Sequence, residues 1–92
     1  MHASIWVFRG DPDVLLRAYD AAVAEIPADD MKLHLCLRAP DGIVLVDTCP
    51  SKEVFDAFAA GGTPLVRLGL PEPERVDDLP VHATFVDGRR AV

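Results

Sequence analysis

The residues best suited to acid–base chemistry in this sequence are His34 and Asp47. They lie in two apolar segments that a short turn separates, and both fall on one face if these segments pair as a hairpin. A carboxylate beside an imidazole fixes the ring tautomer and raises its pKa, which suits a general base. The same residues also make an ordinary cross-strand polar pair, so both interpretations stay open.

The register of this hairpin decides whether the pair forms. A four-residue connection around Pro40-Asp41-Gly42 would place His34 opposite Asp47. A two-residue connection would instead oppose Asp47 to Cys36 and His34 to Cys49. Asp-Gly is a strong turn signal in either case.

A further histidine, His82, follows Pro80 in a terminal segment that is typical of a strand. It could act as a proton shuttle or a haem ligand, or it could simply bond a backbone carbonyl. The predicted catalytic set is therefore His82, His34 and Asp47. No cofactor is required by the sequence, and haem is the only one considered.

The two cysteines, Cys36 and Cys49, fall on the predicted face of His34. Cysteine and histidine together bind zinc, but no CxxC or HxxxH spacing supports a metal site. We expect two thiols that pack as small apolar side chains, with no metal.

Aromatic side chains could line a pocket for a planar apolar ligand. They could equally fill a core or a subunit interface. The predicted ligand-binding set is Trp6, Phe8, Tyr19, Phe55 and Phe58.

Charge and motifs exclude several classes of function. The formal net charge of −6 argues against nucleic-acid binding, and no GxGxxG, P-loop or nucleophile-elbow motif is present. The N-terminus lacks a basic, apolar leader, and no run approaches about 18 apolar residues. We therefore expect a cytoplasmic protein with neither nucleic acid nor membrane as a partner.

The elements that would position these residues follow from apolar periodicity and turn signals. Either Ser51 or Pro50 could begin the second helix. The predicted elements are a strand at 3–9, a helix at 12–26, strands at 31–39 and 43–49, a helix at 51–60, a packed loop or helical turn at 63–80 and a last strand at 79–86.

This order predicts one α+β domain over residues 1–92, with the ferredoxin-like βαββαβ arrangement and a four-stranded antiparallel sheet. We expect both helices to cover the face of Ile5, Val7, Leu33, Leu35, Leu37, Val44 and Val46. The opposite face would be sealed by a second copy, because its apolar members are too large a patch to leave in water. That face carries Ser4, Trp6, Phe8, His34, Cys36, Leu45, Asp47, His82 and Thr84.

Five segments carry a family resemblance: the strand at 3–9, the helix after Gly10-Asp11-Pro12, the strand ending in Val46-Asp47-Thr48, the helix at 51–58, and the tail from Gly69-Leu70-Pro71 to Pro80-Val81-His82. In these the chain resembles the dimeric α+β barrel superfamily, in its small bacterial branch similar to antibiotic-biosynthesis monooxygenases. The resemblance implies a homodimer in which the two sheets form an α+β barrel. It also implies a monooxygenase-like enzyme that acts on an apolar small molecule.

The resemblance does not carry the catalytic residues across. Better-known members use an Asn together with a Trp, whereas this chain has Trp6 and no Asn at any position. Only Trp6 and His82 could therefore correspond to the family's catalytic residues. The alternative is a non-catalytic dimer that binds a small apolar ligand or serves as an assembly partner. An effector-binding module is a third possibility, but the chain has no DNA-binding segment of its own.

Overall fold

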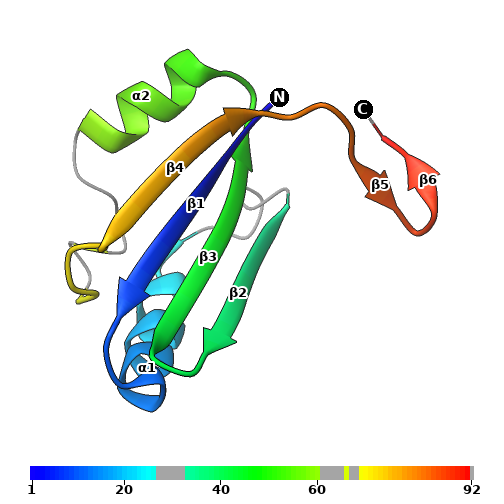
Figure 1. Ribbon diagram of the computed structural model, residues 1–92. Helices are drawn as coiled ribbons and strands as arrows, with labels where there is room; N and C mark the ends of the chain where they lie inside the picture. The colour runs from blue at the N-terminus through cyan, green and yellow to red at the C-terminus, as the bar shows by residue number, and fades with distance from the viewer. Residues whose placement is uncertain (27–32, 61–65, 67–68, 92) are drawn as a thin grey trace.

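The protein folds around one four-stranded antiparallel sheet with two helices (Figure 1). The computed structural model describes residues 1–26, 33–60, 66 and 69–91. Its elements are β1 (His2–Arg9), α1 (Pro12–Val23), β2 (His34–Ala39), β3 (Gly42–Cys49), α2 (Lys52–Ala60), β4 (Arg75–Pro80), β5 (Phe85–Val86) and β6 (Arg89–Arg90). Residues 31–32 of the predicted second strand, and 63–65 and 67–68 of the predicted loop, lie outside the described residues.

The strand order is β2-β3-β1-β4, and each neighbouring pair is antiparallel. Each helix therefore connects two strands that have a third strand between them. This order is compatible with a ferredoxin-like fold, and the predicted α+β class with four antiparallel strands and two helices is confirmed.

Local signals explain where α1 begins. Asp11 is the N-cap, and its side chain accepts a hydrogen bond of 2.9 Å from the backbone N–H of Asp13. Pro12 occupies the first helical position, where its missing N–H costs nothing. The helix ends at Val23, three residues before the predicted end at Ile26.

The α2 helix begins at Lys52 because Ser51 caps it. The Ser51 hydroxyl accepts a hydrogen bond of 3.2 Å from the backbone N–H of Val54, which resolves the choice between Ser51 and Pro50. Phe55 is the buried residue of this helix, while Phe58 is exposed. The helix therefore contacts the sheet along a narrow stripe.

The β2–β3 turn consists of Pro40 and Asp41, because Ala39 already pairs with Gly42. The Asp-Gly signal predicts Gly42 in the turn, but the structure places Gly42 in β3. A Cβ at Gly42 would lie 1.9 Å from the carbonyl oxygen of Phe8, so only glycine allows β1 and β3 to approach at this point. His34 nevertheless lies opposite Asp47, which is the register predicted for a four-residue connection.

The predicted last strand at 79–86 is wrong. The fourth strand, β4, is at Arg75–Pro80, within the segment predicted to be a loop. As an edge strand, β4 carries charged residues and a terminal proline, which are common on edge strands and obscure the strand pattern.

Residues 81–91 form an arm that ends in a separate β5–β6 hairpin (Figure 1). The two-residue turn is Asp87-Gly88, and both residues have positive φ, as the favoured tight hairpin turn requires. Phe85 and Val86 on this hairpin are 66% and 55% exposed.

The helices cover the opposite sheet face from the one predicted. The core beneath them contains Trp6, Phe8, Leu15, Ile43, Leu45, Phe55 and Leu70. Large aromatic side chains fill the space under the helices, and polar members of this face are tolerated because they form hydrogen bonds, Trp6 with Ser4 and His2 with Asp78. The aliphatic face is left uncovered in the single chain, with Leu33, Leu35, Leu37 and Leu79 exposed.

Candidate functional site

A cleft of about 390 Å³ opens between α2 and the β1–β4 edge of the sheet. Its aromatic walls are Trp6 from β1 and Phe55 from α2, whose ring centroids are 6.1 Å apart at 49°. The remaining lining residues are Ala59, Val66, Glu72, Pro73, Val76 and Asp78. The cleft is therefore mainly apolar, with two carboxylates.

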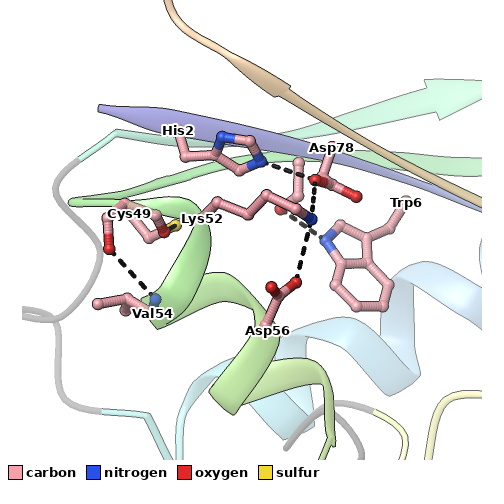
Figure 2. Close-up of polar contacts among 9 residues, drawn as sticks. His2, Trp6, Cys49, Lys52, Val54, Asp56 and Asp78 are labelled. Carbon is pink, nitrogen blue, oxygen red and sulfur yellow. Dashed lines mark hydrogen bonds and ion pairs between the residues drawn. The ribbon is translucent and has the colours of Figure 1, made fainter.

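A polar network ties β1, β4 and α2 together beside this cleft (Figure 2). The Asp78 carboxylate accepts hydrogen bonds from His2 Nε2 at 2.7 Å and from Lys52 Nζ at 3.2 Å. The hydrogen bond from His2, and then that from Lys52, lowers the pKa of Asp78. Lys52 also contacts Asp56 at 3.2 Å, and these two carboxylates raise its pKa.

Ser4 fixes the Trp6 side chain within the cleft wall. The indole Nε1–H of Trp6 donates to the Ser4 hydroxyl at 2.8 Å, and both residues are buried. Because this donor is satisfied inside the protein, the indole ring is held in one orientation. In the sheet Ser4 stands opposite Asp78 of β4 on one side and Asp47 of β3 on the other.

A second polar group lies under α1. The Tyr19 hydroxyl is 2.7 Å from His34 Nε2, and His34 Nδ1 is 3.4 Å from Asp47 Oδ1. His34 Nδ1 and Asp47 Oδ1 are both buried, and neither has a hydrogen-bond partner in the part of the chain that the structure describes. Burial raises the pKa of Tyr19, with a smaller contribution from Cys36. Tyr19, His34 and Asp47 therefore form a row of polar side chains beneath α1.

The structure divides the predicted site residues among several places. Trp6 and Phe55 line the cleft, whereas Tyr19 contacts His34. Phe8 is fully buried in the core, and Phe58 is exposed on α2.

His82 and the cysteines lie outside the cleft lining. His82 is exposed on the arm after β4. Burial raises the pKa of the Cys36 thiol, so it stays protonated near neutral pH. Cys49 donates from Sγ to the carbonyl of Ser51 at 3.2 Å (Figure 2). Among the described residues, no group of three or more His, Cys, Asp and Glu side chains is placed to hold a metal ion.

Sequence reasoning missed His2, Lys52, Glu72 and Asp78. The alternation of β1 did contain a signal, because His2 shares the parity of Ser4 and Trp6. Glu72 and Asp78 could not be placed, because their segment was predicted to be a loop.

No protein-family model, curated protein or solved structure matches this chain. None of the helices in the described ranges is long and apolar enough to cross a membrane.

Proposed function

We propose that this chain is a homodimeric binding protein for a small apolar molecule, which it holds in the cleft beneath α2. The observation that carries the proposal is the cleft of about 390 Å³ lined by Trp6 and Phe55. Ligand sites commonly have volumes of about 300–1,000 Å³ and mainly apolar walls with a few polar groups.

The cleft walls support binding because they are built before any ligand arrives. Trp6 is held by Ser4, and the α2 wall is tied to β4 through Lys52 and Asp78. A preformed site loses less conformational entropy when a ligand binds.

The homodimer is supported by the uncovered aliphatic face of the sheet. Leu35 and Leu37 of β2 are exposed there, and Ile5 and Val46 are only half-buried. A contiguous apolar face of this kind is unusual on a monomer, and the same patch on two copies is self-complementary about a two-fold axis. Pairing of two such sheets is also what the resemblance to the α+β barrel superfamily implies.

Fluorescence of Trp6 tests the binding function, because Trp6 is the chain's single tryptophan. The probe is N-phenyl-1-naphthylamine, a neutral apolar dye that quenches tryptophan by energy transfer. We expect saturable quenching. The variant Ala59→Phe should weaken the dye's affinity by at least about tenfold, because the larger side chain fills the cleft.

The matched control is Ala57→Phe, the same change at an exposed position of α2 that is not part of the cleft lining. It should bind the dye like the parent protein. Equal affinity in both variants, or no saturable quenching in the parent, would show that the cleft is not a binding site.

A second candidate function is catalysis of a monooxygenase-like kind on the same molecule. The row of Tyr19, His34 and Asp47 supports it, because a buried imidazole beside a carboxylate can move a proton. Ser4 of β1 lies between Asp47 of this row and Asp78 of the cleft lining, so only one strand separates the two groups.

Haem does not fit as the cofactor of such an enzyme. The described lining of the cleft contains no histidine, cysteine or methionine to ligate iron. His82, the residue considered for this role, is exposed on the arm. We therefore derive no step through haem.

A further inference from the structure

We propose that the ligand of the α2 cleft is an apolar amine, whose ammonium group is recognised by Glu72 while its hydrocarbon part packs between Trp6 and Phe55. This inference rests on the proposed binding function and names the class of ligand. It follows from the difference between the two carboxylates that line the cleft and from the cation already present beside it.

The two carboxylates in the cleft lining differ in whether a partner already neutralises them. Asp78 is already compensated by His2 and Lys52. Glu72, in contrast, has no hydrogen bond or ion pair with any described residue. A ligand cation would therefore meet Glu72 as an uncompensated charge at the mouth of an apolar cleft.

The charged side chains of the described cleft lining are negative. Among the described lining residues both ionisable ones, Glu72 and Asp78, are acidic, and the neighbouring His2 and Lys52 are already bonded to Asp78. The chain as a whole carries a formal charge of −6. Clefts lined by one sign of charge concentrate ligands of the opposite sign and disfavour like-charged ones. An anionic ligand of the same shape should be excluded.

The protein already places an ammonium group, that of Lys52, next to an aromatic ring and two carboxylates beside the cleft. Lys52 Nζ lies 6.0 Å from the centroid of the Phe55 ring and pairs with Asp56 and Asp78. Aromatic faces attract cations, tryptophan most strongly. Trp6 and Glu72 likewise bring an aromatic ring and a carboxylate to the lining of one cleft.

The test compares three probes that share a hydrocarbon part and differ in charge: 4-phenylbutylamine, 4-phenylbutan-1-ol and 4-phenylbutyrate. Their affinities for the full chain are measured by calorimetry and by Trp6 fluorescence at low ionic strength. We expect the amine to bind about fivefold more tightly than the alcohol, and the carboxylate to bind most weakly. The preference for the amine should shrink as salt is added.

The deciding variant is Glu72→Gln, which should bring the amine's affinity to that of the alcohol and leave the alcohol's affinity unchanged. The matched control is Glu74→Gln, since Glu74 pairs with Arg9 and does not line the cleft. Equal binding of amine and alcohol to the parent protein, or an amine preference that persists in Glu72→Gln, overturns this inference while binding itself stands. Failure of all three probes to bind would count against the proposed function as well.

Discussion

At the scale of single residues, Asp78 joins three elements through one carboxylate. The Asp78 carboxylate accepts hydrogen bonds from His2 of β1 and from Lys52 of α2, and it thereby holds the helix against the β1–β4 edge (Figure 2). The hydrogen bond from His2 is the main reason that the pKa of Asp78 is lowered. A lowered pKa in the folded state means that the ionised carboxylate stabilises the fold.

The sign of this effect gives a prediction for Asp78→Asn. The contribution of Asp78 is fully present above the unfolded pKa of about 3.9 and is lost as the pH falls through the lower folded value. We expect the variant to unfold at lower urea concentration than the parent near neutral pH. The difference should vanish in acid, where the parent carboxyl is protonated.

Asp20→Asn is the matched control, because Asp20 is exposed on α1 and forms no ion pair with any described residue. Its urea midpoint should stay close to that of the parent protein at neutral pH. If the urea midpoints of Asp78→Asn and the parent still differed in acid, the lost stability would come from the changed shape of the side chain and not from its charge.

The proton-transfer row under α1 can be tested in the same residue-by-residue way. The probe is 5-nitrobenzisoxazole, whose ring opens to a coloured phenolate when a base removes one proton. If Asp47 orients His34 as a general base, the parent protein should accelerate this reaction. Asp47→Asn should lower the rate at least about tenfold.

Asp56→Asn is the control for this experiment, since Asp56 is exposed on α2 and its carboxylate pairs with Lys52, away from His34 and Asp47. It should leave the rate unchanged. If Asp47→Asn reacts as fast as the parent, His34 and Asp47 are a structural pair beneath α1.

At the scale of elements, the sequence was sufficient for the order of the first five, and it narrowed the hairpin register to two possibilities. Strict alternation in β2 and the capping residues of α1 are local signals, and the structure agrees with them. His34 opposite Asp47 followed from one of the two registers that the sequence left open. These features depend on neighbours in the chain, which is why they could be predicted.

The choice of sheet face could not be made from alternation. Both faces of β1 are apolar, with Trp6 and Phe8 on one and Ile5 and Val7 on the other. The aliphatic face looked more uniform, but the aromatic face has the volume needed to fill the space beneath two helices. Periodicity reports that a residue faces one side and does not report which side the helices cover.

The same limit explains the missed part of the site. β4 is an edge strand whose Asp77 and Asp78 resemble loop composition, and its pairing with β1 joins residues 68 to 78 positions apart in the sequence. Long-range pairing of this kind leaves no local trace in the sequence. The sequence therefore does not predict the cleft, although it indicates Trp6 and Phe55 as candidate ligand-binding residues.

At the scale of the whole molecule, two features of the single chain expose large apolar side chains. One is the aliphatic sheet face, and the other is the arm that holds β5 and β6 apart from the sheet (Figure 1). A two-stranded hairpin is marginally stable alone in water, so a hairpin that exposes Phe85 needs a surface to pack on. Two copies joined through their sheets would supply one.

The arm and the remaining chain also carry different charges. Residues 81–92 contain Arg89, Arg90 and a single acidic residue, Asp87, whereas all the other acidic residues precede them. Packing of the arm on a second copy would bring a basic segment to an acidic body, which favours association.

Leu37→Glu tests this arrangement. Leu37 pairs with Val44 on the aliphatic face and is 46% exposed, and a carboxylate there would be desolvated at a two-fold interface. We expect the parent to sediment as a dimer and the variant as a monomer with unchanged helix content by circular dichroism. Val54→Glu is the matched control, because Val54 on α2 is 45% exposed and faces away from the proposed interface. It should remain dimeric. A monomeric parent, or a Leu37→Glu protein that stays dimeric, would remove the sheet face as the interface.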